Sequence, residues 1–101
     1  MVESNRVEVS TGLLSAVADP IRWQLIGQLS ADDTRCVCQF RTEPEIPANL
    51  LSYHLKVLRA AGLLTSERRA SWVYYAVVPE ALREIAALLD LNTAALAGVP
   101  A

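Results

Sequence analysis

The chain has 101 residues, of which 52% are hydrophobic and 20% are charged, and its formal net charge is −2. This length predicts one domain with a real core, although so small a domain buries limited area and would gain from dimerisation. No apolar run is long enough to span a bilayer, and no basic segment followed by an apolar one marks a signal peptide. These features favour a cytoplasmic protein and argue against a membrane protein.

The first part of the chain predicts a flexible arm followed by two helices. We expect residues 1–10 to form the arm and residues 11–18 to form a short apolar helix. Asp19 and Pro20 then begin a second helix, as its N-cap and its first helical residue. Trp23 is expected to pack at the edge of this helix. Its buried stripe is expected to consist of four apolar side chains at helical spacing, namely Ile21, Leu25, Ile26 and Leu29.

A polar loop and a short third helix are expected next. Residues 30–34 are polar and predict the loop. Val37 and Phe40 lie three residues apart, which favours a helix over residues 35–41. Residues 42–46 contain a proline between two glutamates and therefore predict a turn.

The stretch from Pro47 to Gly62 carries the signals of both ends of a helix. Proline is tolerated at the first helical position, and glycine is favoured just past the last one, where φ is positive. The leucines at spacings of four and three predict one buried stripe, formed by Leu51, Leu55 and Leu58. The opposite face combines hydrogen-bonding, aromatic and basic side chains without a carboxylate, namely Asn49, Ser52, Tyr53, Lys56 and Arg59. Such a face suits a helix that lies along phosphates and base edges.

Two extended segments on either side of a basic tip predict a β-hairpin after this helix. Residues 72–78 are rich in β-branched and aromatic side chains, which favours a strand. At the tip, Arg68, Arg69 and Ser71 are candidates for contacts with DNA phosphates. Together with the preceding helix, this region has an excess of basic residues in a chain that is acidic overall, so that one surface could face DNA.

A last helix is expected to begin at Pro79, and residues 92–101 are expected to form a flexible tail. The apolar side of this helix would be formed by Leu82, Ile85, Ala86 and Leu89. Residues 11–91 therefore predict three helices, a turn, a fourth helix, a basic hairpin and a final helix. A helix-turn-helix followed by a β-ribbon is a winged helix, in which the second helix of the motif enters the major groove. We predict a mainly α, winged helix-turn-helix fold with a two-stranded wing.

Three segments share a further pattern: Asp19-Pro20-Ile21-Arg22, the run from Leu51 to Leu63 with its Ser-x-His-Leu-x-x-Leu core, and Trp72-Val73-Tyr74-Tyr75. With them the chain resembles the ArsR/SmtB family of bacterial metal- and metalloid-responsive repressors. The resemblance implies a homodimer built from the first and last helices. It also implies an inverted-repeat DNA operator that is released when an effector binds. In this pattern His54 is a candidate for a DNA contact or for a hydrogen bond that packs helices.

Cys36-Val37-Cys38, at the start of the predicted third helix, is similar to the Cys-Val-Cys motif of the arsenic and heavy-metal sensors of this family. On a regular α-helix, side chains two residues apart are roughly 200° apart around the axis, so one ion could bond both sulfurs only if the helix start is distorted. Thiolates select thiophilic ions such as As(III), Sb(III), Cd(II) and Zn(II). A helix N-terminus and the adjacent Arg35 favour the thiolate form. Binding would then deform the first helix of the DNA-binding unit, as a two-state switch.

The number of ligands separates these ions. The third cysteine of many arsenic sensors of the family corresponds to Arg41. Cadmium sensors of the family add cysteines from the arm, which has none here, and zinc sensors often use histidine on the last helix, which also has none. Tetrahedral zinc therefore lacks ligands, whereas trivalent arsenic needs three, the third being a small thiol, hydroxide or water. We predict that Cys36 and Cys38 bind As(III) or Sb(III), with Cd(II) and Zn(II) less favoured.

Two alternatives use the same cysteines differently. The pair could form a redox or persulfide switch, or it could be structural in a winged-helix module that binds constitutively. Enzyme activity is not expected, because a chain with one histidine offers no converging acid, base and nucleophile.

Overall fold

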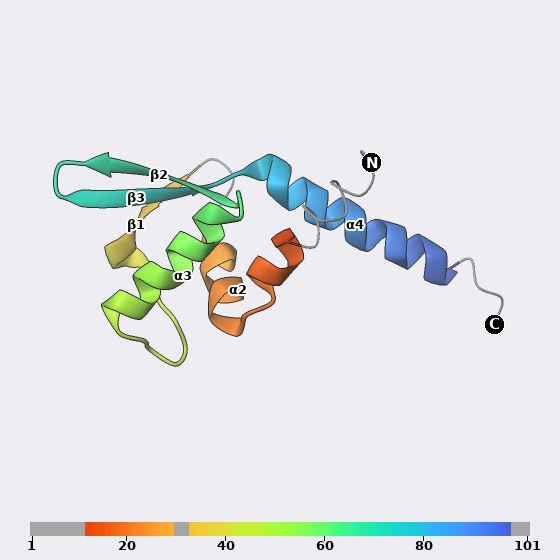
Figure 1. Ribbon diagram of the computed structural model, residues 1–101, viewed down its shortest axis with the longest axis horizontal. Helices are drawn as coiled ribbons and strands as arrows, with labels where there is room; N and C mark the ends of the chain where they lie inside the picture. Colours follow the sequence, from red (N-terminus) through yellow and green to blue (C-terminus); the bar gives the residue numbers. More distant parts are fainter. Residues whose placement is uncertain (1–11, 30–32, 98–101) are drawn as a thin grey trace.

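The computed structural model describes residues 12–29 and 33–97, with the backbone alone for residues 91–97. The predicted arm and part of the loop, residues 30–32, lie outside the described residues. After a helical segment at residues 12–17, the elements in order are α2 (Pro20–Gly27), β1 (Thr34–Cys36), the 3-10 turn η1 (Val37–Gln39), α3 (Ala48–Ala60), β2 (Leu64–Arg69), β3 (Trp72–Val77) and α4 (Pro79–Ala97) (Figure 1). No helix in this described part is both long enough and apolar enough to cross a bilayer.

The start of α2 matches the prediction. One carboxylate oxygen of Asp19 accepts hydrogen bonds from the backbone N–H groups of Ile21 and Arg22, at 2.8 and 3.1 Å. The bond from the Arg22 N–H is the main reason why the pKa of Asp19 is lowered, because it favours the charged carboxylate. Leu25 is fully buried, whereas Trp23 is 64% exposed. The expected packing of Trp23 is wrong, because a residue two positions before Leu25 lies on the opposite side of the helix.

The predicted third helix is wrong, and its place is taken by a strand and a short turn. β1 pairs with β3 in an antiparallel arrangement, so that the sheet has three strands in the order β1-β3-β2 instead of a two-stranded hairpin. Val37 and Phe40 are three residues apart, but this pattern covers only one helical turn, and a single turn is not stable alone. The edge of β3 offers unpaired backbone N–H and C=O groups, and pairing with them overrides the weak helical signal.

The helix α3 forms as predicted, with Pro47 as its N-cap rather than its first helical residue. Gly62 has a φ of +87°. Around it, the N–H of Leu63 donates to the Leu58 carbonyl and the N–H of Gly62 donates to the Arg59 carbonyl, both at 3.0 Å. These two bonds form a Schellman motif, which ends the helix and turns the chain toward β2.

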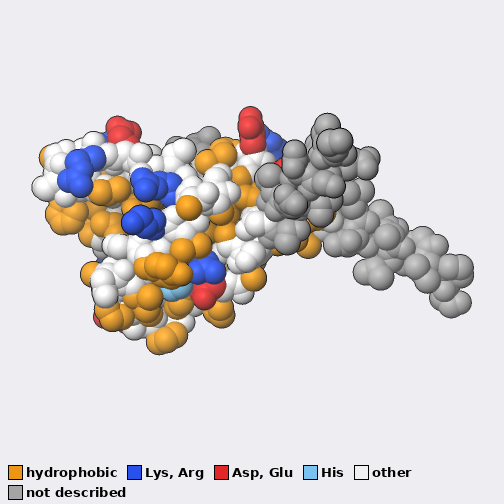
Figure 2. Space-filling view, in the orientation of Figure 1, with side chains coloured by type: hydrophobic (Ala, Val, Ile, Leu, Met, Phe, Trp, Pro, Cys, Tyr) orange, Lys and Arg blue, Asp and Glu red, His pale blue; other side chains and the backbone are white. Residues whose placement is uncertain are grey.

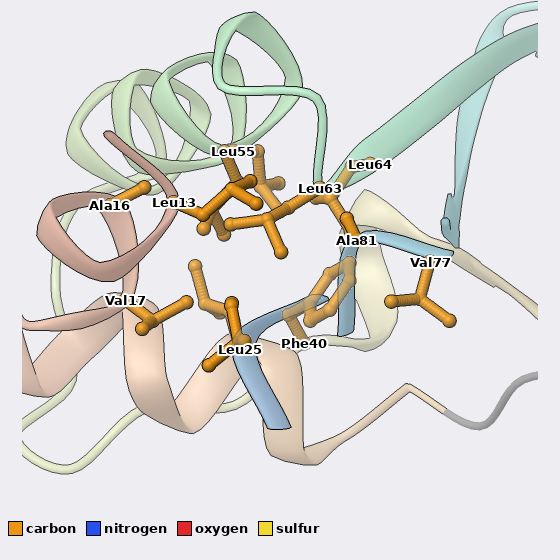
Figure 3. Close-up of a cluster of buried hydrophobic side chains, with 12 residues drawn as sticks. Leu13, Ala16, Val17, Leu25, Phe40, Leu55, Leu63, Leu64, Val77 and Ala81 are labelled. Carbon is orange, nitrogen blue, oxygen red and sulfur yellow. The ribbon is translucent and has the colours of Figure 1, made fainter. Parts of the chain in front are cut away.

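One core joins all of these elements (Figure 3). Side chains from the 12–17 segment, α2, α3, the base of the wing and α4 converge on it, and Phe40 reaches it from the segment after η1. The fully buried side chains include Leu25, Leu55, Leu58 and Leu63. Because Leu55 and Leu58 lie in this core, the other side of α3 is fixed toward solvent.

The helix α4 differs from the prediction in length and in its buried face. It continues to Ala97, because residues 92–97 contain good helix formers and no glycine or proline. Ala81 and Ile85 are buried and Leu82 is half-buried, as a helical stripe requires, whereas Leu89 is 53% exposed and Ala86 is also exposed. In Figure 1, the C-terminal part of α4 extends away from the other elements.

The turn between β2 and β3 contains a strained residue. Ala70 has a φ of 56°, and among the described residues it is the one non-glycine residue with positive φ. It is the first of the two residues that join the strands, the position where hairpin turns of type II′ favour glycine. The positive φ of an L-residue costs about 1–2 kcal/mol.

We therefore expect Ala70→Gly to raise the free energy of unfolding by about 0.5–1 kcal/mol, after the greater freedom of glycine in the unfolded chain is subtracted. The measurement is urea denaturation at a fixed protein concentration. Ser71→Gly is the control and should lower stability slightly, because Ser71 has no positive φ to relieve. Equal effects of the two substitutions would show that Ala70 is not strained.

Candidate functional site

The two cysteines lie side by side at the junction of β1 and η1. Cys36 ends β1 and is 3% exposed, whereas Cys38 is in η1 and is exposed. The Cys38 thiol donates to the Cys36 sulfur, with the two Sγ atoms 2.7 Å apart. This contact is the main reason why the pKa of Cys38 is raised. The prediction that the sulfurs point apart is wrong, because it assumed an α-helix.

The Cys36 sulfur also acts as the N-cap of η1. It accepts the backbone N–H of Cys38 at 3.4 Å, and the side chain of Gln39 accepts the backbone N–H of Cys36 at 2.9 Å. These bonds form a reciprocal capping box, and they hold the turn without a regular helix. Phe40, the next residue, is 5% exposed. The turn is therefore anchored in the core on both sides of the exposed Cys38.

Gln24 of α2 and Gln28, the C-cap of this helix, hold the segment that connects this turn to α3. Gln28 accepts the Arg41 N–H at 2.8 Å and donates to the Arg41 carbonyl at 2.6 Å. Gln24 does the same with Glu43, at 2.8 and 2.9 Å. Each side-chain amide thus imitates the backbone of a neighbouring strand. Sequence reasoning missed both residues, because an amide on a helix surface gives no signal until its partner segment is placed.

A groove of about 610 Å³ lies between α3 and the wing. Six of the predicted DNA-contact residues line it, namely Asn49, Ser52, Tyr53, Lys56, Arg59 and Arg68. Figure 2 shows Lys and Arg side chains gathered over the same part of the molecule. Arg59 donates to the hydroxyl of Ser66 at 3.1 Å and so connects α3 to β2. Ser66, Val73 and Tyr75 also line the groove and were not predicted, because only the strand pairing shows which side chains face α3.

The other three predicted contact residues lie outside the lining of this groove. Arg69 forms an exposed ion pair with Glu67, its Nε atom 3.3 Å from the carboxylate, and its guanidinium lies over the Tyr74 ring at 4.7 Å. Ser71 is exposed at the tip of the wing. An exposed ion pair is weak, so the pairing does not prevent Arg69 from contacting another anion.

His54 is the third of these residues, and it is only 7% exposed. Its Nδ1 atom lies 3.1 Å from a terminal nitrogen of Arg22. Because arginine can only donate, Nδ1 accepts this hydrogen bond. The Nε atom of Arg22 donates to the Ala16 carbonyl at 2.6 Å. Of the two roles expected for His54, this geometry matches the hydrogen bond that packs helices, since Arg22 connects α2, α3 and the 12–17 segment.

Comparison with known proteins identifies the chain's relatives. The family model described as "Bacterial regulatory protein, arsR family" matches residues 19–66. An uncharacterized HTH-type transcriptional regulator from Methanocaldococcus jannaschii is 28% identical over 84% of this chain and 96% of its own length. The arsenical resistance operon repressor of Escherichia coli is 31% identical over 77% of this chain and 67% of its own length. The chain spans about half to two thirds of the length of other arsenical and SmtB repressors that it matches.

A solved structure confirms the predicted fold. It is the homodimeric winged helix-turn-helix DNA-binding domain of a possible ArsR-family regulator from Mycobacterium bovis. The two chains superpose with a TM-score of 0.71 and 21% identity, over 93% of this chain and 87% of the other. At this identity the likeness shows the fold alone.

The contact between Arg22 and His54 leads to a test of stability. We expect Arg22→Met to lower the free energy of unfolding by about 1–3 kcal/mol, because it leaves a buried imidazole nitrogen and a carbonyl without their donor. Arg22→Lys should recover only part of this loss, since lysine lacks the planar fork. Urea denaturation measures both, with Arg83→Met on the exposed side of α4 as the control, for which we expect a change within about 0.5 kcal/mol. If Arg22→Met resembles that control, the contact does not stabilise the fold.

Proposed function

The chain belongs to the arsR family of bacterial regulatory proteins, and on this premise we propose that it is a cytoplasmic transcriptional repressor controlled by a metalloid. It would bind an inverted-repeat operator as a homodimer and release it when Cys36 and Cys38 bind As(III) or, alternatively, Sb(III). The observation that carries this proposal is the contact of the two sulfurs at 2.7 Å. Two thiols in contact can bind one thiophilic ion together.

The donor set supports a trivalent ion over zinc or cadmium. In the described part of the chain, no group of three or more Cys, His, Asp or Glu residues could hold a metal ion. A tetrahedral zinc site needs four ligands. Arsenite can lose two hydroxyl groups as water when it bonds to the Cys36 and Cys38 sulfurs, and its third substituent needs no protein ligand.

Residues 36–39, which we call the cysteine turn, contact the elements proposed to bind DNA. A thiophilic ion bonded to both sulfurs replaces the hydrogen bond between them. It also competes with the cap that the Cys36 sulfur provides for η1. Cys36 pairs with Tyr74 of β3, and Gln24 and Gln28 hold the segment leading to α3. A change in the turn therefore acts on the wing and on α3 together.

The groove between α3 and the wing suits the proposed DNA interface. The side chains of Lys56, Arg59 and Arg68 supply positive charge for phosphates, and Asn49, Ser52 and Tyr53 supply hydrogen-bonding groups for the groove of the duplex. Arg69 and Ser71 would contact phosphates beside it. For the homodimer, we propose contacts through the 12–17 segment and through α4, which extends away from the other elements (Figure 1).

A second candidate function is regulation by thiol oxidation or by persulfides. The observation in its favour is again that an exposed sulfur touches a buried one. Release by arsenite in the presence of a phosphine reductant would support the metalloid, and release by oxidant or persulfide alone would support this alternative.

The cysteines can be tested with a double serine variant. Cys36→Ser with Cys38→Ser should keep the fold and bind the operator, because serine caps a helical turn as well as cysteine does. We expect it to remain on the DNA at arsenite concentrations that release the wild type fully. Fluorescence anisotropy of a footprinted DNA fragment measures release, and urea denaturation checks stability. Release of the variant at the wild-type concentration would show that the effector binds elsewhere.

The groove can be tested by the salt dependence of DNA binding. Lys56→Ala and Arg68→Ala should each weaken binding to all sequences alike. Each should also reduce the slope of log K against log salt by about 1, because one phosphate contact is lost. Arg83→Ala, on the exposed side of α4 and outside the groove, is the matched control, and at a protein concentration where size-exclusion chromatography shows it to be dimeric it should leave the slope unchanged. A change in sequence preference without a change in slope would mean that the side chain reads a base edge instead.

A further inference from the structure

The proposed effector site leaves one substituent of trivalent arsenic to another molecule. Cys36 and Cys38 supply two sulfurs, and Arg41 occupies the position three residues later. No side chain in the described part of the chain completes a group of three metal ligands around them. The following inference rests on the proposed function and concerns what occupies the third position.

A cavity of about 490 Å³ lies beside Cys38. Cys38 and Phe40 line it on the side of the turn, and Leu51 and Ser52 line it on the side of α3. A water or hydroxide occupies only about 30 Å³. Sites that bind small organic molecules have volumes of about 300–1,000 Å³. The cavity next to the exposed sulfur therefore has room for an organic molecule.

Opposite charges line this cavity. Arg41 donates from one terminal nitrogen to the carbonyls of Cys38 and Phe40, both at 3.1 Å, which holds its guanidinium next to the turn. Its other terminal nitrogen and its Nε make no hydrogen bond with the described residues. Glu45 lines the same cavity, and no ion pair joins it to Arg41 in the described part of the chain. A cation and an anion in one cavity, not paired with each other, match a molecule that carries both a carboxylate and an ammonium group.

We propose that this cavity binds a low-molecular-weight amino-acid thiol, which supplies the third sulfur to arsenic. Its carboxylate would face Arg41 and its ammonium would face Glu45. One arsenite, As(OH)₃, condenses with the two cysteine thiols and the small thiol to give three As–S bonds and three water molecules. Arsenic stays trivalent, so the step needs neither an oxidant nor a reductant.

The position of the cavity also explains how the small thiol would affect DNA binding. Ser52 lines both this cavity and the groove between α3 and the wing. Leu51, its neighbour, lines the cavity and packs against the core. A bound thiol thus contacts the N-terminal half of α3 directly, in addition to any change transmitted through the cysteines.

The test uses the intact protein, a phosphine reductant and arsenite, with one added thiol at a time. The thiols are L-cysteine, glutathione, cysteamine with an ammonium alone, 3-mercaptopropionate with a carboxylate alone, and uncharged 2-mercaptoethanol. We expect the arsenite concentration for half-release of the operator to be lowest with L-cysteine or glutathione, and the better of the two identifies the size of the ligand. X-ray absorption should show three sulfurs around arsenic with that thiol, and two sulfurs and one oxygen without any thiol.

Two exposed charges provide matched variants. Glu45→Gln should raise the half-release concentration about two- to five-fold for thiols with an ammonium and leave it unchanged for 3-mercaptopropionate and 2-mercaptoethanol. Arg41→Gln should raise the half-release concentration by a similar factor for thiols with a carboxylate and leave it unchanged for cysteamine. Comparing each variant with the wild type for the same thiol removes differences in thiol acidity.

The outcomes separate this inference from the proposed function. If arsenite releases the operator equally well with every thiol and with none, and arsenic keeps an oxygen ligand, the small-thiol site is wrong while the repressor proposal stands. If arsenite neither binds nor releases the operator under any condition, the proposed function fails as well. Equal effects of Glu45→Gln on all five thiols would also overturn the assignment of the cavity.

Discussion

The pairing of β1 with β3 is the interaction on which the rest of this structure depends. It places Cys36 opposite Tyr74 and Arg35 opposite Tyr75, so the cysteine turn is hydrogen-bonded to the wing. The same turn continues into α3 through a short segment, which is held by Gln24 of α2 and by Gln28 at the C-cap of α2. The two elements that line the candidate DNA groove thus share one attachment point, and that point contains both thiols.

Burial at this attachment point is uneven, which suits a switch. Cys36 and Phe40 are buried in the core, whereas Cys38 between them is exposed. A ligand can therefore reach one sulfur from solvent but must involve the other in the interior. Because packed interiors shift between discrete arrangements rather than deform gradually, a change at Cys36 is transmitted to its neighbours.

The helix α3 lies between the groove along the wing and the cavity beside Cys38. Its core side, with Leu55 and Leu58, is fully buried and sets the rotation of the helix about its axis. That rotation turns one group of side chains toward the groove along the wing and another toward the cavity beside Cys38, and Ser52 borders both. The residues of α3 that could contact DNA and those that could contact a ligand are therefore neighbours on the helix.

The sequence by itself determined α3, the cap at Asp19, the wing and the pair of candidate thiols, because each depends on residues close together in the chain: leucine spacing, Gly62, a capping carboxylate and a Cys-x-Cys motif. Only the tertiary structure decided that residues 34–39 form a strand and a 3-10 turn, that the sulfurs touch, and that His54 accepts from Arg22. These features depend on partners distant in the sequence, namely the free edge of β3 and the surface of α2. Long-range pairing of this kind outweighs a local helical preference of a few residues, and for that reason the local pattern predicted a helix where the structure has a strand and a 3-10 turn.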